Sequence, residues 1–102
     1  MLRSIVLILI AALPLAAQER AATTVILVRH AEKAATPADD PPLTKAGQAR
    51  ARALAVIAHD AGVTAIVTTQ FVRSRTTAEP AASALGITPE VVRAVGATHA
   101  QD

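Results

Sequence analysis

The sequence predicts an α/β protein in three layers, with helices on both faces of a mainly parallel sheet. β-branched runs without polar alternation, which are typical of strands buried on both faces, alternate with segments of helical periodicity. The segments follow one another as strand, helix, strand, helix, strand with short connections. This order favours parallel strands joined by right-handed crossovers.

The first half of the predicted fold is a strand, a loop and a helix. The strand covers Thr23 to Val28, and the Pro- and Asp-rich residues 31–42 after it predict a loop. A helix is expected from Lys45 to Ala61, with Thr44 as its N-cap. Gly62 is expected to end this helix at the position that favours a left-handed residue.

The second half repeats the alternation. Residues 63–68 predict another buried strand, and residues 72–85 a second helix that ends at Gly86. Pro80 removes one backbone donor within this helix and is expected to kink it. Residues 90–95 predict a third strand.

The composition allows one small domain with a thin core. Of the 85 residues after Ala17, 18 are Val, Ile, Leu or Phe, about 21%, which is close to the level of roughly 20% below which chains stop folding. The sequence has no Cys, so it contains no disulfide or thiolate metal site. A net charge of +2 and a single aromatic residue argue against nucleic-acid binding.

Residues 1–17 have the pattern of a secretory signal peptide. A basic start at Arg3 precedes the apolar run Ile5 to Leu13, which Pro14 ends, and small residues follow up to Ala17. The run is much shorter than the roughly 20 apolar residues that span a bilayer. We therefore expect cleavage near Ala17, a periplasmic or secreted protein made of residues 18–102, and no membrane attachment after cleavage.

Three polar residues lie where a parallel sheet binds ligands, beyond the carboxyl ends of its strands. Arg29 and His30 follow the first predicted strand, and Arg73 follows the second at the start of a helix. Two guanidiniums beside a helix N-terminus suit a phosphate dianion, and a neutral imidazole can attack phosphorus. The alternative is two surface charges and a histidine at a strand end. The matched positions favour the phosphate site.

The segments VILVRHAEK, DPPLTKAGQARARALA and AIVTTQFVRSRTTAEPAASALGI together resemble the histidine phosphatase superfamily, which has the phosphoglycerate mutase-like fold, in its small bacterial extracytoplasmic branch. The resemblance implies that His30 is the nucleophile that becomes a phosphohistidine. It implies that Arg29 and Arg73 bind the transferred phosphate. It also implies that no metal or other cofactor is needed, since the positive pocket neutralises the phosphate.

The chain departs from the family pattern at several places. Ala31 stands where the family has Gly after the histidine, and Thr69 with Gln70 stands where Ser-Pro is common. The family's second pocket histidine, in a GH motif, and its acid have no match. His99 is the only late histidine and is expected to have no role. We therefore expect residues 18–102 to be the N-terminal part of a longer, C-terminally truncated phosphatase domain.

For the remaining polar residues, a structural or solvent-exposed role is weighed against a functional one. Glu32 is an auxiliary candidate, as an orienting group or proton donor for His30, although a solvated loop charge is favoured. His59 is expected to complement the dipole of the first helix. The remaining charged loop residues are expected to lie at the rim of the pocket or in solvent, namely Lys33, Asp39 and Asp40.

The sequence thus predicts a phosphomonoester hydrolase that acts on small phosphorylated substrates. Its turnover is expected to be weak, because a second histidine and an acid are missing. The alternative is a pseudoenzyme that binds phosphate or a phosphoester without turnover. Neither the substrate nor the oligomeric state can be derived from these residues.

Overall fold

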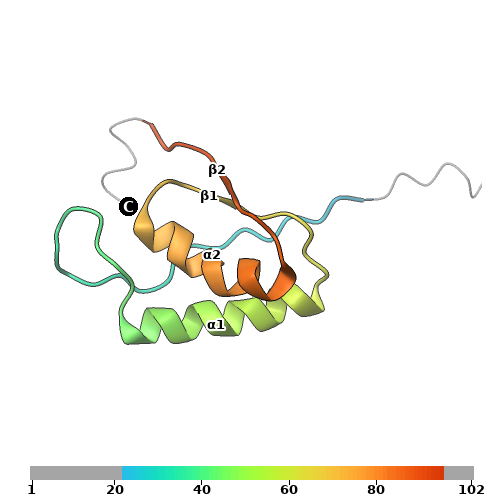
Figure 1. Cartoon of the computed structure of the whole chain (residues 1–102), viewed down its shortest axis with the longest axis horizontal. Coiled ribbons are helices and arrows are strands. Elements are labelled where there is room, and N and C mark those ends of the chain that lie inside the picture. Colours follow the sequence, from blue (N-terminus) through green and yellow to red (C-terminus); the bar gives the residue numbers. More distant parts are fainter. Residues whose placement is uncertain (1–21, 96–102) are drawn as a thin grey trace, which may run out of the picture.

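The computed structural model describes residues 22–95, which form two helices beside two short strands (Figure 1). The elements are α1 (Lys45–Asp60), β1 (Val67–Thr68), α2 (Val72–Leu85) and β2 (Glu90–Val91). The predicted signal peptide and His99 lie outside the described residues. Within residues 22–95, no helix is long and apolar enough to cross a membrane.

Helix α1 begins and ends through the contacts that its sequence predicts. The Oγ1 atom of Thr44 accepts the backbone N–H of Gly47 at 3.0 Å, which caps the first turn. At the other end Gly62 has φ 68°, and the N–H of Val63 donates to the carbonyl of Ala58 at 3.1 Å. A left-handed residue followed by this bond is the usual helix stop. The predicted helix is confirmed to within one residue.

Helix α2 has the predicted bounds and a similar end. It continues through Pro80 to Leu85, and Gly86 follows with φ 65°. The N–H of Ile87 then donates to the carbonyl of Ala82 at 2.9 Å. At its start, the N-cap residue Phe71 offers no side-chain hydrogen bond. The first turn of α2 therefore depends on another segment for its cap.

The two strands pair in parallel, as the sequence predicts, but they are much shorter than expected. Val67 lies opposite Glu90 and Thr68 opposite Val91. The N–H of Glu90 donates to Ile66 at 2.9 Å and that of Val92 to Thr68 at 2.8 Å. The predictions of strands over 63–68 and 90–95 are thus wrong in length. Each strand has one described neighbour, so the ladder supports only a few residues.

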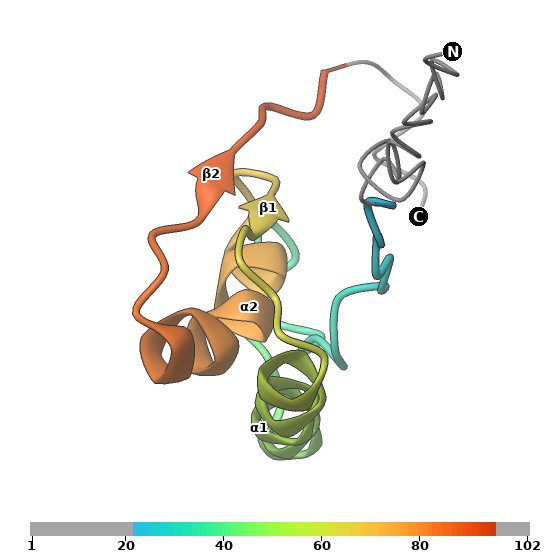
Figure 2. The same cartoon turned by 90° about the vertical axis from the view of Figure 1, so that its right-hand side faces the viewer.

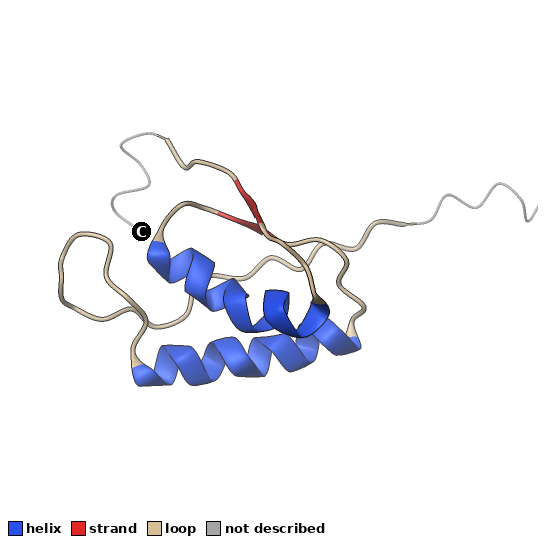
Figure 3. Cartoon of the chain, viewed as in Figure 1, coloured by secondary structure: helices blue, strands red, loops and turns tan. Residues whose placement is uncertain are grey.

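The predicted first strand, 23–28, is not formed. These residues are extended, and they are drawn as loop in Figure 3. Their backbone makes no hydrogen bond to the backbone of another described residue. Val25 is 79% exposed and Leu27 93% exposed. The β-branched composition favours extended backbone, but a strand also requires a neighbour to accept its hydrogen bonds.

Both helices lie on one side of the strands and pack against each other (Figures 1 and 2). Among residues 22–95 there is a helical layer and a layer of strands and extended chain, without the second helical layer that the sequence predicts. The core is thin, as expected. Ala31, Leu43 and Ala51 form its buried cluster, and the other buried apolar side chains are also alanines, namely Ala58, Ala81 and Ala82.

Candidate functional site

The His30 side chain has a defined proton arrangement. Its Nδ1 atom lies 2.8 Å from the carbonyl oxygen of Ala31. A carbonyl only accepts, so this contact assigns the proton to Nδ1 and makes the ring the donor. The lone pair of a neutral imidazole is then on Nε2. His30 is half-buried, and among the described residues its ring hydrogen bond is the one from Nδ1.

Both helices hold the chain immediately after His30. The N–H of Ala31 donates to Oγ1 of Thr77 in α2 at 2.9 Å. The carbonyl of Glu32 accepts the N–H of Thr44, the N-cap of α1, at 2.8 Å. His30 therefore follows an unpaired extended segment but precedes two anchored residues.

The first turn of α1 approaches residues 31–32 so closely that only glycine fits. A Cβ atom on Gly47 would lie 2.3 Å from the carbonyl oxygen of Glu32. Four residues further along α1, Ala51 is 1% exposed in the core with Ala31. The spacing LT-x-x-G-x-x-R-A thus has a local physical reason. It packs the start of α1 against the residues that follow His30.

The two predicted phosphate arginines differ in their surroundings. Arg29 is exposed, and Arg73 is half-buried with its guanidinium carbon 4.3 Å from the centre of the Phe71 ring. An arginine over an aromatic face gains a cation–π interaction. Neither arginine lines the groove in which His30 lies. Their roles in binding phosphate remain predictions.

Glu32, the auxiliary candidate, is directed to α1. Its Oε1 atom accepts from Nε of Arg50 at 2.6 Å, and both side chains are exposed. A hydrogen bond from its own backbone N–H, followed by the bond from Arg50, lowers the pKa of the Glu32 carboxyl. The carboxylate is therefore ionised at neutral pH, a state that accepts a proton but does not donate one.

Asp40 has a structural task that the sequence did not reveal. Its Oδ1 atom accepts the N–H of Val72 at 2.9 Å, so a loop residue caps the first turn of α2. Lys33 forms an isolated antiparallel bridge with Leu43 at the base of the same loop. Asp39 is exposed, as expected of solvated charge.

His59 has the position that the sequence predicts. It lies exposed in the last turn of α1, with Nδ1 3.5 Å from Oδ1 of Asp60. A basic side chain at this end of a helix complements the helix dipole.

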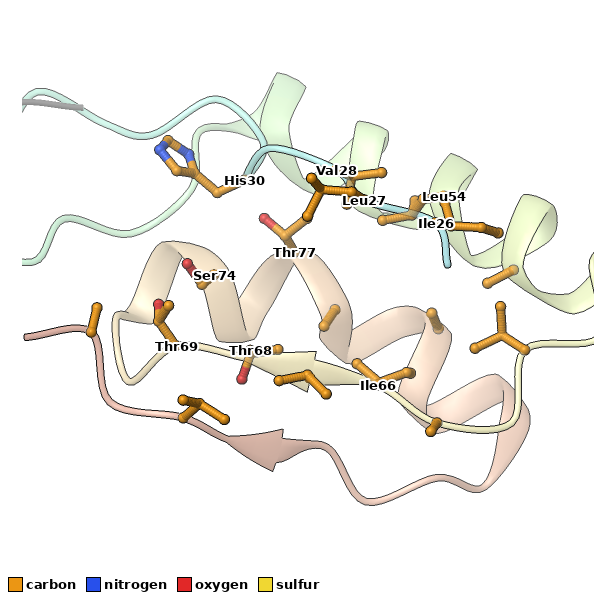
Figure 4. Close-up of a pocket in the computed structure, with 18 of the residues that line it drawn as sticks. Ile26, Leu27, Val28, His30, Leu54, Ile66, Thr68, Thr69, Ser74 and Thr77 are labelled. Carbon is orange, nitrogen blue, oxygen red and sulfur yellow. The ribbon is translucent and has the colours of Figure 1, made fainter. Parts of the chain in front are cut away.

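His30 lies at one end of a groove of about 610 Å³ between the extended segment and β1 (Figure 4). The end near His30 is polar and includes Thr69, Ser74 and Thr77, whereas apolar side chains line the rest: Ile26, Leu27, Val28, Leu54, Ile57 and Ile66 are among them. No carboxylate and no second histidine of the described residues lines it. Within residues 22–95 there is also no cluster of metal-ligating side chains.

Two hydroxyl groups along this groove lack a partner. The Oγ1 atoms of Thr68 and Thr69 are buried and make no hydrogen bond within the described chain. An unsatisfied buried hydroxyl is unfavourable, so a polar atom bound beside it would be stabilised. Thr69 stands where the family commonly has serine, and its hydroxyl lines the same groove as His30.

Sequence reasoning missed Thr77, whose hydroxyl joins the residue after His30 to α2. The signal was present in the R-x-x-x-T-A pattern, where the threonine lies one helical turn after Arg73. The pattern indicated a family resemblance, but it did not show which backbone group the hydroxyl binds.

Comparison with known proteins agrees with the motifs. A family model described as the histidine phosphatase superfamily (branch 1) matches residues 25–96, from the extended segment before His30 past the end of β2. A search of curated proteins finds no match. Because the family model covers more than half of the 102 residues, and because its span includes all three motifs, the chain belongs to the histidine phosphatase superfamily (branch 1).

Proposed function

We propose that this protein is a phosphomonoester hydrolase in which His30 takes up the phosphoryl group. Membership of the histidine phosphatase superfamily supports a phosphatase-type function. The observation that carries the proposal is the contact between His30 Nδ1 and the Ala31 carbonyl, 2.8 Å long. In the neutral imidazole this contact places the lone pair on Nε2, and a nucleophilic imidazole needs such a lone pair.

The proposed reaction has two displacement steps. In the first, the Nε2 lone pair forms a bond to phosphorus while the bond from phosphorus to the ester oxygen breaks, and the departing oxygen takes a proton from solvent water. In the second, a water oxygen attacks phosphorus and the bond to Nε2 breaks, which releases inorganic phosphate and restores His30. Substrates are small phosphorylated molecules, and no cofactor takes part.

Arg29 and Arg73 are the proposed phosphate ligands. Guanidiniums bind phosphate oxygens through paired N–H donors and stabilise the charge of the transferring group. Arg73 is in the first turn of α2, next to Ser74, which lines the groove with His30. When phosphate binds, the Arg73 guanidinium leaves its contact with the Phe71 ring and binds the phosphate oxygens instead.

A second function, phosphate binding without turnover, is favoured by the placement of Glu32. This carboxylate is ionised and paired with Arg50, so it is a poor donor for the leaving oxygen. Neither Glu32 nor any other carboxylate of residues 22–95 lines the groove. General acid catalysis contributes about 10² to 10⁴-fold to such reactions. We therefore propose weak turnover for the 102-residue chain.

We further propose that the protein acts outside the cytoplasm, as residues 18–102 after cleavage near Ala17. The basic, apolar and small-residue pattern of residues 1–17 supports this. N-terminal sequencing of the protein exported by a bacterial host tests it. A mature N-terminus near Gln18 is expected, and an intact Met1 in the exported protein would contradict it.

The function is tested by measuring phosphate binding and aryl phosphate hydrolysis in the purified protein. Wild type is expected to bind inorganic phosphate and to hydrolyse the ester slowly, whereas His30→Asn abolishes hydrolysis and Arg73→Ala weakens binding. His59→Asn is the matched control, because His59 is exposed at the far end of α1. Equal hydrolysis by wild type and His30→Asn would overturn the hydrolase. Binding without any hydrolysis would favour the second function.

A further inference from the structure

We infer that Thr77 is a positioning residue, whose hydroxyl fixes His30 relative to the helix that carries Arg73. This inference rests on the proposed function of His30 and Arg73. Thr77 is 6% exposed, and its hydroxyl makes two contacts. It accepts the N–H of Ala31 at 2.9 Å and donates to the carbonyl of Arg73 at 2.6 Å.

The directions of the two bonds make the link specific. A hydroxyl has one proton, and the carbonyl of Arg73, one turn back in α2, takes it. The oxygen lone pairs are then left for a donor, which is the N–H of Ala31, 46 residues away in sequence. One buried oxygen atom thus joins the backbone of Arg73 to the residue that follows His30.

Ala31 transmits this link to the imidazole. Its N–H is held by Thr77, and its carbonyl accepts the Nδ1 proton of His30. The Ala31 methyl group is also held, because the residue is 3% exposed in the core with Leu43 and Ala51. With Ala31 held on both sides, the His30 ring keeps its tautomer and its place in the groove.

The extended segment before His30 makes this anchor more important. Residues 22–30 form no backbone hydrogen bond to the backbone of another described residue. Within the described chain, the backbone around His30 is therefore fixed from its C-terminal side, by Thr77 and by the contacts of Glu32 with α1. A displacement of about 1 Å at a reacting group can cost about 10²-fold in rate.

The test compares Thr77→Val with Thr76→Val in the full chain. Thr76 is the matched control, because its hydroxyl also donates one turn back in α2, to Val72 at 2.6 Å, whereas the Ala31 N–H and the His30 ring bond to other groups. Amide exchange at Ala31 and the ¹⁵N signals of the His30 ring are measured by NMR. T77V is expected to speed Ala31 exchange about tenfold, the effect of one ordinary hydrogen bond, and to reduce the Nδ1–H tautomer. T76V and Thr77→Ser are expected to keep both values of the wild type.

The outcomes separate this inference from the proposed function. If T77V leaves the Ala31 exchange and the His30 signals as T76V leaves them, the inference is wrong. If T77S shows the T77V changes, the methyl group matters rather than the hydroxyl, and the inference also fails. Should T77V not fold, Thr77→Ala removes the same hydroxyl, and unfolding of both while T76V folds would overturn a positioning role. Phosphate affinity is measured in parallel, and a wild type that binds none contradicts the proposed function alone.

Discussion

The helical side of this molecule, α1 and α2, and its extended side, residues 22–30 with β1 and β2, have equally clear sequence patterns. The helices form nearly as predicted, whereas the strands do not. Helices α1 and α2 match their predicted bounds to within one residue, Thr44 caps α1 as expected, and both helices stop at the expected glycines. On the extended side, three predicted strands become an unpaired segment and two strands of two residues each. The difference reflects where the backbone hydrogen bonds are made. A helix makes them within its own segment, whereas a strand makes them to a neighbour.

This difference also divides the site. His30 lies at the junction, with the unpaired residues 22–29 before it and the anchored residues 31–32 after it. The motif residues Thr44, Gly47 and Thr77 all act on the anchored side. The helical side therefore holds His30, the proposed nucleophile, from one direction.

The largest expected effect contrasts a leucine from each side. Leu43 is 6% exposed in the core cluster, and Leu27 is 93% exposed in the extended segment. Leu43→Ala is expected to lower the free energy of unfolding by about 2–4 kcal/mol, and Leu27→Ala by less than about 0.5 kcal/mol. Urea unfolding of both variants measures the contrast. Equal losses would show that the extended segment is packed in solution.

The next largest effect on stability compares two glycines, Gly47, which is required by a close backbone approach, and Gly62, which is required by its left-handed backbone conformation. A Cβ at Gly47 would meet the Glu32 carbonyl at 2.3 Å, whereas Gly62 has open space but φ 68°. Gly47→Ala is expected to destabilise by about 2–3 kcal/mol, as overpacking does, and Gly62→Ala by about 1 kcal/mol from the left-handed backbone. Thermal unfolding of the pair orders the two losses. The reverse order would contradict the packing of α1 on residues 31–32.

A smaller effect tests the cap that Asp40 places on α2. Asp40→Ala removes the acceptor for the Val72 N–H and is expected to cost about 1 kcal/mol. Asp40→Asn keeps a side-chain oxygen in the same place, so most of the stability is retained. Urea unfolding measures both variants. If Asp40→Asn lowers the free energy of unfolding as much as Asp40→Ala does, the negative charge of Asp40 matters and the hydrogen bond does not.

The smallest effect is the pH dependence of the Glu32 and Arg50 pair. The fold lowers the pKa of Glu32, so its contribution to stability is complete above the pKa of the unfolded chain and disappears as the pH falls through the lowered value. Glu32→Gln is expected to remove this part of the acid sensitivity, and about 1 M salt to weaken it, since the pair is exposed. The control is Glu79→Gln, at an exposed position on α2. Unfolding curves at several pH values that match for wild type and Glu32→Gln would show that the pair contributes nothing.

Particular residues show how far the sequence could predict this molecule. Thr44, Gly62 and Gly86 bounded the helices because their effects are local. The motifs around His30 and Arg73 predicted the family, which the family model confirms. The strand over 23–28 was predicted from composition, but composition does not supply the neighbour that a strand pairs with.

For the site, the sequence predicted which residues belong to it but not how their side chains are arranged. The positions of Arg29, His30 and Arg73 in the sequence do not show that Arg73 lies over Phe71. The contacts of Asp40 with α2 and of Thr77 with Ala31 span 32 and 46 residues, so no local pattern reveals them. Long-range contacts of single side chains depend on the packing of both elements.

The most direct test of the account is to trap the phosphorylated protein. Wild type is mixed with an aryl phosphate, quenched in alkali, where a phosphorus–nitrogen bond survives, and mapped by mass spectrometry, with His30→Asn as the control. The account predicts a phosphoryl group on His30, lost on acid treatment and absent from the variant. Hydrolysis of the ester by wild type with no phosphohistidine, or with the phosphoryl group on a hydroxyl such as that of Ser74, would contradict it.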